Sequence, residues 1–317
     1  MDEPQSWERY KDCVSWCTVQ ARKSHLLLFR MLRETDTRDP LAVAGRIRRD
    51  YLGLYPEGDR LFVPQVFGWA IDCFTGRHPE YQAIDARYHD LEHTLQGALC
   101  LSGLLCGRQL SGDRPALERE QFELATLAIL FHDTGYLKRR SDNVGTGAKY
   151  TATHVQRSCE FAAEFLSSKG YSPAAIRSVQ NMIRCTGMNA NVAAIPFQNE
   201  MERLCGFALG TADLLGQMAA PDYVDKLPTL YEEFLEAGRF NGNPGAVGFA
   251  SVEDLVRKTP GFWEKYVLPK ISTDFGGLFH FLAPPGANGV NEYLAHIEAN
   301  IARIRRLTGI PVPAPAI

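Results

Sequence analysis

The segment FELATLAILF, at residues 122–131, constrains the fold of this chain more than any other feature. It is the most apolar stretch of the sequence, and it lies inside a helical pattern at 115–132. A helix that is apolar nearly all round has to be covered on every side by other elements. The sequence therefore predicts a central, fully buried helix that ends just before Gly135.

Helical periodicity extends over most of the remaining chain. Apolar residues recur at spacings of three and four, and Ser172 followed by Pro173 is typical of a helix cap and first turn. No alternating apolar pattern is long enough to indicate a sheet, so we predict an all-α fold. The expected helices lie at 4–34, 91–105, 115–132, 155–166, 173–183, 201–215, 221–234, 260–281 and 289–308. We expect Pro269 to bend the helix at 260–281.

The composition excludes several classes of protein. The 317 residues are 45% hydrophobic and carry a net charge of −3, which argues against a nucleic-acid or membrane binder. No apolar run reaches the roughly 18 residues that span a bilayer, and the N-terminus (MDEPQSWERYKD) does not resemble a signal peptide. The eight cysteines form no CxxC pair, which indicates reduced core thiols. We expect a cytoplasmic protein that acts on a small molecule and is compatible with a homo-oligomer.

His132 and Asp133 follow the central apolar segment directly. Both side chains are costly to bury unless they are paired or bound to a metal ion, and adjacent nitrogen and oxygen donors suit a divalent cation. Asp213 lies in an otherwise apolar helix and needs a partner for the same reason. A metal ion is the simplest partner, and the alternative is a buried ion pair of Asp213 with Arg184 or Arg203.

Three further histidines add donors. His89 and His93, in the segment YHDLEH, are four residues apart, so a helix places both on one face. His154 opens the helix after the central one and can face the same site, and the alternative is a surface histidine. The sequence therefore predicts a metal site among these donors.

The ordered set of donors resembles the HD superfamily of metal-dependent phosphohydrolases. FHDTGY resembles the HDxG turn of that family, and THVQRSCEFAAEFL resembles the histidine-containing helix that follows it. YHDLEH resembles the YHNxxH segment of the cyclic-nucleotide phosphodiesterase branch. The resemblance covers residues 85–220 well and the flanks poorly. It implies an HD-domain helical bundle with extra N- and C-terminal helices.

The resemblance also divides the chain. We expect residues 1–75 to form an N-terminal helical extension packed on the core, and residues 76–240 to form an HD-type catalytic helical core. Residues 241–310 would add C-terminal helices that complete the same domain, and residues 311–317 would form a flexible tail.

The resemblance assigns roles to individual residues. The ligands of the first metal ion would be His93, His132, Asp133 and Asp213. His89 would protonate the leaving oxygen instead of binding metal. His154 matches the first of two further histidines in binuclear members, whereas the second has no counterpart and Cys185 is the nearest donor. Asp90 replaces the asparagine of the motif and would repel a phosphate unless a second metal ion neutralised it.

These ligand types imply hydrolysis by a metal-activated water. One or two divalent ions (Mn, Mg, Fe, Zn or Ni) would lower the pKa of bound water, and Asp133 would orient it. A phosphoryl group also needs cationic contacts. The candidates for these contacts are Lys138, Arg139, Arg140, Lys149 and Arg184. For residues 138–140 the alternative is an ordinary solvated loop.

We therefore predict a metal-dependent hydrolase that cleaves a phosphoester, with nucleotides and cyclic nucleotides among the candidate substrates. Two alternatives stay open: an HD-domain di-iron oxygenase acting on a small polar substrate, and a non-catalytic module that senses a nucleotide. The missing second late histidine argues against the oxygenase. The intact ligand set argues against the sensor.

Overall fold

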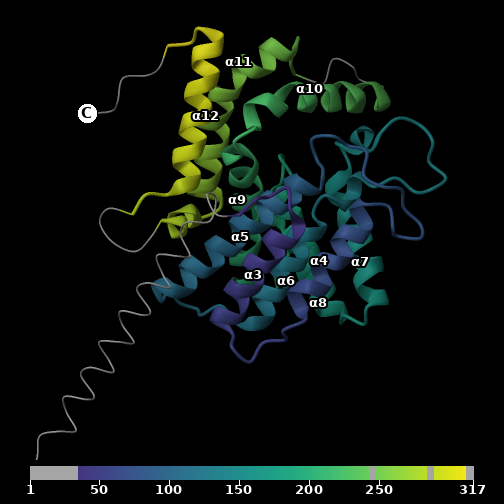
Figure 1. The fold of residues 1–317 in the computed structure, drawn as a ribbon, viewed down its shortest axis with the longest axis vertical. Helices are drawn as coiled ribbons and strands as arrows, with labels where there is room; N and C mark the ends of the chain where they lie inside the picture. The colour runs from purple at the N-terminus through teal and green to yellow at the C-terminus, as the bar shows by residue number, and fades with distance from the viewer. Residues whose placement is uncertain (1–34, 243–247, 284–288, 312–317) are drawn as a thin grey trace, which may run out of the picture.

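The computed structural model describes residues 35–242, 248–283 and 289–311, which form an all-α structure (Figure 1). In this part of the chain, the β-type pairing is limited to one antiparallel bridge between Tyr81 and Arg139. The all-α prediction is therefore confirmed. The α-helices are α3 (Pro40–Leu54), α4 (Phe62–Phe74), α5 (Leu91–Ser111), α6 (Arg119–Phe131), α7 (His154–Ser168), α8 (Pro173–Ile183), α9 (Glu200–Ala219), α10 (Tyr223–Phe240), α11 (Val252–Phe262) and α12 (Glu292–Thr308).

Helices α5 and α9 pack against each other at the centre, with α10, α11 and α12 at one end of the molecule (Figure 1). Glycines bring the two central backbones together. A Cβ atom on Gly216 would lie 2.8 Å from the carbonyl group of Gln96, and one on Gly97 would lie 3.9 Å from the Cα of Asp213. This close approach places the first turn of α5, with His93, near Asp213 of α9.

Helix α6 is the buried helix that the apolar segment predicts. Within 122–131 every residue is buried except Glu123, which accepts a hydrogen bond from the hydroxyl of Tyr51. The helix begins at Arg119 rather than at 115, because the preceding segment is held in another conformation. The backbone N–H of Leu117 donates to the side-chain oxygen of Gln109 in α5. Helix α6 ends at Phe131, so His132 and Asp133 lie at its C-terminal end.

Several other expected elements are confirmed. Helix α7 begins at His154, and α9 carries Asp213. Ser172 caps α8 by accepting from the backbone N–H of Ala175 at 3.2 Å, with Pro173 in the first turn. The helix expected at 4–34 lies outside the described residues, as does all but the first residue of the expected tail.

The sequence prediction missed two helices and misplaced another. Helices α3 and α4 lie within the expected helical extension at 1–75 but were not predicted individually, although Asp39 and Pro40 form a cap and first turn for α3. The prediction of one bent helix over 260–281 is wrong. Helix α11 begins at Val252 and is followed by π-type turns at Trp263–Val267 and Lys270–Asp274. Pro269 lies between these turns and lacks the N–H that a regular α-helix would use there.

Two further expectations concern the core and membranes. The six cysteines of the described residues are buried and form no disulfide: Cys73, Cys100, Cys106, Cys159, Cys185 and Cys205. Cys13 and Cys17 lie outside the described residues. None of the helices in the described ranges has the length and apolar character needed to cross a bilayer.

Candidate metal centre

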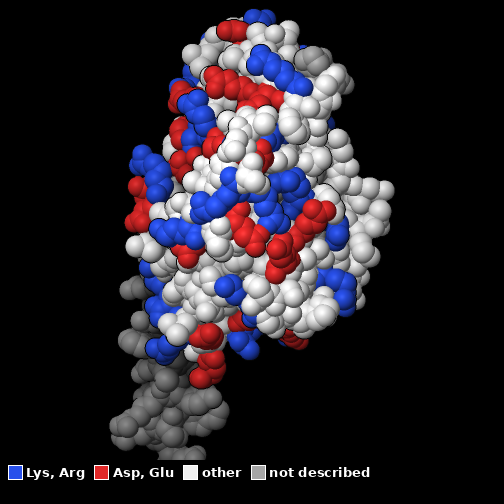
Figure 2. All heavy atoms as spheres, turned by 90° about the vertical axis from the view of Figure 1, so that its right-hand side faces the viewer, with Lys and Arg blue, Asp and Glu red and all other residues white. Residues whose placement is uncertain are grey.

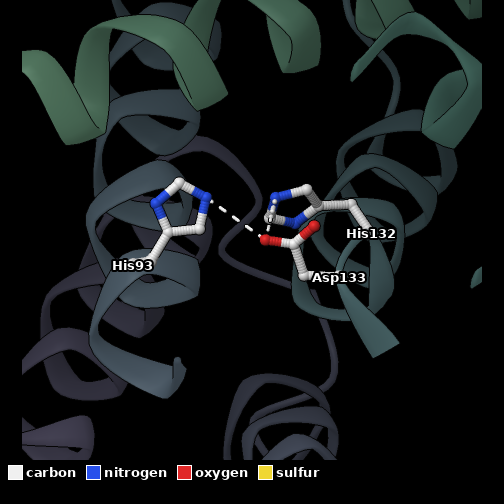
Figure 3. A group of neighbouring side chains, drawn as sticks. All are labelled: His93, His132 and Asp133. Atoms are coloured by element: carbon white, nitrogen blue, oxygen red, sulfur yellow. Dashed lines mark ion pairs between the residues drawn. The ribbon is translucent and has the colours of Figure 1, made fainter. Parts of the chain in front are cut away.

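Side chains from three helical segments converge at the centre of the molecule. His93 comes from the first turn of α5, His132 and Asp133 from the end of α6, and Asp213 from α9. Figure 3 shows His93 facing His132 and Asp133 across the space between two helices. The ligand atoms of these three residues all lie within 4.8 Å of one another, so the group can hold a metal ion.

Asp213 lies next to this group and is close to both imidazoles, although it is not one of the three residues whose ligand atoms all lie within 4.8 Å of one another. Nε2 of His93 lies 3.2 Å from Oδ2 of Asp133 and 3.2 Å from Oδ1 of Asp213. Nε2 of His132 lies 3.2 Å and 3.5 Å from the same two oxygens. All four side chains are buried. The alternative of an ion pair between Asp213 and Arg184 or Arg203 is wrong. Arg184 donates to Asn181 instead, and Arg203 pairs with Glu200.

The hydrogen bonding of His132 suits a cation in the cluster. Nδ1 of His132 donates to the carbonyl oxygen of Ile129 at 2.7 Å, so Nε2 of the neutral ring carries a lone pair. This nitrogen and Oδ2 of Asp133 are buried without a hydrogen-bond partner among the described residues. A lone pair facing carboxylate oxygens is repelled unless a proton or a metal ion lies between them. The donor set therefore fits a divalent metal ion.

In the absence of metal, protons supply the positive charge. Burial lowers the pKa of His93, but the carboxylates of Asp133 and Asp213 outweigh burial and raise this pKa to about 9. The pKa of His132 is likewise raised well above its ordinary value, against burial, by the same two carboxylates. Burial alone would raise the pKa values of Asp133 and Asp213, yet the facing imidazolium groups hold both well below the usual range. A divalent ion would replace these protons.

His154 lies near the oxygen of Asp133 that does not face His93 and His132. Its Nε2 is 3.9 Å from Oδ1 of Asp133, and its Nδ1 donates to the carbonyl oxygen of Thr151 at 2.7 Å. Burial lowers the pKa of His154, which favours the neutral ring. Asp133 thus presents one oxygen to His93 and His132 and the other to His154. The surface-histidine alternative is wrong, since the His154 side chain is only 19% exposed.

Cys185, the nearest donor to the missing second histidine, does not supply a ligand in this structure. Its side chain is buried, and its thiol lies 3.7 Å from the carbonyl oxygen of Asn181. Burial raises the pKa of the thiol to about 12, so it stays protonated at neutral pH.

His89 contacts a residue that the sequence did not single out. Nδ1 of His89 lies 2.6 Å from Oε2 of Glu233, and the other oxygen of Glu233 accepts the backbone N–H of Tyr88 at 2.7 Å. Glu233 comes from the middle of α10 and is buried, whereas its neighbour Glu232 is exposed. Burial raises the pKa of Glu233, but the charge of His89 outweighs it and lowers this pKa.

Tyr136 forms a wall beside the two outer histidines, His89 and His154, whose ring centroids are 6.3 Å apart. Its ring stacks on the ring of His89, with 4.4 Å between centroids, and on that of His154, with 4.7 Å between centroids. The side chain is fully buried in the turn that follows Asp133. His89, Tyr136 and His154 are therefore parts of one packed unit.

Asp90 has a structural role at this site. Its carboxylate caps α5 by accepting the backbone N–H of His93 at 2.9 Å. An asparagine would make the same contact. The aspartate at this position is explained by the cap without reference to a second metal ion.

The structure gives other partners to the cations that we expected to bind a phosphoryl group. Lys138 pairs with Asp85 at 2.7 Å, and Lys149 pairs with Asp142 at 2.6 Å. Both lysine side chains are buried. Arg139 pairs with Glu80. On the molecular face drawn in Figure 2, basic and acidic groups lie close together. These contacts do not support a role of the expected cations in substrate binding, which stays a prediction for Lys138, Arg139, Arg140, Lys149 and Arg184.

Fold and site together define a class: an all-α protein with a buried histidine–aspartate cluster able to hold a metal ion. Comparison with protein families places the chain more narrowly. Residues 140–305, more than half of the chain, match the Npun_R2479-like family, and the chain belongs to this family of unknown function. The matched part includes His154, Asp213 and Glu233. The curated proteins contain no match. The match carries no link to the HD superfamily, so that resemblance stays a prediction.

Proposed function

We propose that the protein is a metal-dependent hydrolase that cleaves a small phosphoester. The observation that carries the proposal is the combination of a buried four-donor cluster with a separate histidine, His89, that is held by Glu233 beside it. The cluster consists of His93, His132, Asp133 and Asp213. The resemblance to the HD superfamily agrees with this combination.

The four donors would hold one divalent ion through two nitrogens and two oxygens. A second ion would be held by His154 and by Oδ1 of Asp133, the oxygen that faces His154. A bound metal ion supplies a Lewis acid for a phosphoryl oxygen and lowers the pKa of a coordinated water. The burial of the cluster keeps bulk water away, which strengthens every electrostatic interaction in the site.

His89 would serve as the proton donor to the leaving oxygen. Because Nδ1 faces Glu233, Nε2 is the nitrogen left for a substrate. The carboxylate of Glu233 fixes the orientation of the ring and faces its positive charge when both nitrogens carry protons. The His89 side chain is 15% exposed, more than His93 or His132, which suits contact with an incoming substrate.

The test is hydrolysis of a panel of phosphomonoesters and phosphodiesters by chelated protein reloaded with Mn²⁺ or Mg²⁺, under air and under nitrogen. Release of phosphate or of a phosphomonoester in both atmospheres supports the proposal, since hydrolysis needs no oxidant. A strict requirement for iron and dioxygen without such release would favour the oxygenase. Metal binding without turnover of any ester would favour the sensor module.

A further inference from the structure

The segment Gly145–Thr146–Gly147 is held by charged side chains from three separate parts of the chain. Lys138 donates to the carbonyl oxygen of Gly145 at 2.6 Å. Glu236 of α10 accepts both the backbone N–H of Thr146, at 2.5 Å, and its hydroxyl, at 2.6 Å. We call this segment, with its charged partners, the clamp.

The third charged partner closes the clamp. Asp85 accepts the backbone N–H of Gly147 at 2.7 Å and pairs with Lys138 at 2.7 Å. Lys138 is buried and Asp85 is only partly exposed. Each of the three charged side chains therefore makes a hydrogen bond to this segment.

Each charged partner is close in sequence to a residue of the site. Lys138 follows Asp133 by five residues, Asp85 precedes His89 by four, and Glu236 is one helical turn after Glu233. Helix α10 thus holds His89 with one carboxylate and the clamp with the next. The contacts tie together three segments that carry the proposed catalytic machinery.

The glycine at the end of the clamp packs on the wall of the site. A Cβ atom on Gly147 would lie 2.1 Å from the carbonyl oxygen of Tyr136, so the segment presses directly on that backbone. Tyr136 stacks on both His89 and His154. The turn after Gly147 leads to Thr151, whose carbonyl oxygen accepts from His154.

We propose that the clamp fixes the relative positions of His89 and His154, and that Thr146 and Glu236 are positioning residues for the proposed reaction. The inference rests on the proposed function for its effect on turnover. Its structural part stands on the contacts alone. Loss of the Thr146–Glu236 contact leaves the four metal donors in place and loosens the wall that orients the two outer histidines.

The experiment uses Glu236→Ala, which removes both hydrogen bonds to Thr146, and Thr146→Val, which removes the hydrogen bond from the hydroxyl. Thr146→Ser is the conservative rescue. Glu298→Gln is the control, because Glu298 is an exposed glutamate on a different helix, α12. Hydrogen exchange is followed by mass spectrometry in peptides covering 85–90 and 134–151. We expect faster exchange in both regions in the two disrupting variants, and wild-type exchange in Thr146→Ser and in the control. Bound Mn²⁺ should stay at the wild-type stoichiometry, while turnover falls about tenfold.

The results separate the two proposals. Unchanged exchange at 85–90 in both disrupting variants would overturn the clamp, whatever the enzyme activity is. Loss of Mn²⁺ in parallel with the faster exchange would also overturn it, since the segment would then support the metal ligands instead of the outer histidines. A wild-type protein that hydrolyses no phosphoester would contradict the proposed function, and the exchange data would still decide on the clamp.

Discussion

Nδ1 of His89 lies 2.6 Å from Oε2 of Glu233, although the two residues are 144 positions apart in the sequence. Glu233 also accepts the backbone N–H of Tyr88, so the carboxylate fixes both the ring and the backbone that carries it. The pair lies beside His93, with 5.4 Å between the centroids of the two histidine rings. A histidine held in this way is suited to transfer a proton next to the candidate metal centre.

The first prediction concerns this pair. Glu233→Gln keeps an acceptor for Tyr88 but removes the charge that faces His89, so turnover should fall by about 10²-fold with metal content unchanged. Phosphoester turnover and elemental analysis of the same preparation provide the measurement. Glu232→Gln, on the exposed side of the helix, should keep wild-type turnover. Equal turnover in the two variants would contradict a role for the pair.

The second prediction concerns the leaving group. His89→Ala should keep its metal and lose turnover, and the loss should be smaller for nitrophenyl esters than for alkyl esters. A good leaving group needs little protonation, so it depends less on a proton donor. The measurement is the ratio of kcat for the two ester classes in wild type and variant. If the ratio were unchanged, His89 would not be the proton donor.

The third prediction concerns pH. In the metal-free protein the pKa of His93 is raised from 6.5 to about 9 by Asp133 and Asp213 against the effect of burial. A group with a raised folded-state pKa contributes its stability fully below the unfolded-state pKa, and that contribution is lost as pH rises through the folded-state pKa. The chelated protein should therefore lose stability between about pH 6.5 and 9.

Thermal melts across this pH range, with and without Mn²⁺, provide the measurement. Metal competes with the protons on the imidazoles, so it should bind more tightly and stabilise the protein more as pH rises. A chelated protein whose melting temperature is constant from pH 6.5 to 9 would show that His93 does not pair with the two carboxylates.

The fourth prediction concerns the turn after Asp133. A Cβ atom on Gly135 would lie 2.0 Å from the carbonyl oxygen of His154, so Gly135→Ala should destabilise the protein by about 2 kcal/mol. Gly68, in α4, has nothing within 4 Å of the same position. Gly68→Ala should stabilise the protein by about 1 kcal/mol through helix propensity. Chemical denaturation compares the two, and similar effects of both substitutions would contradict the close packing at Gly135.

Three of the four candidate metal donors could be predicted from the sequence because they end or interrupt an apolar helical pattern, and His93 could be predicted from its spacing to His89. His132, Asp133 and Asp213 occupy positions where burial without a partner is costly, and this cost points to a shared site. Glu233 could have been found in the same way. It follows Leu230 by three residues and precedes Ala237 by four, so it lies on the buried face of α10. In the sequence, the adjacent Glu232 gives this position the appearance of an ordinary solvated face.

The partners of the cations could not be predicted from the sequence. Lys138 and Lys149 look like free phosphate-binding groups in a glycine-rich loop, but their carboxylate partners, Asp85 and Asp142, are identified only by the fold. The π-type turns around Pro269 were missed for a different reason. Their apolar spacing follows a helical period, and the change in hydrogen bonding leaves no clear mark in that period.

The central claim is that His93, His132, Asp133 and Asp213 hold a divalent metal ion. The most direct test is the stoichiometry of Mn²⁺ bound to chelated and reloaded protein, measured for wild type, His93→Ala, Asp133→Ala and Asp213→Ala. His280→Ala is the matched control, since His280 is an exposed histidine in another part of the chain. We predict at least one equivalent in wild type and control and a loss of that ion in the three site variants. Equal binding in all five proteins, or no binding in wild type, would contradict the account.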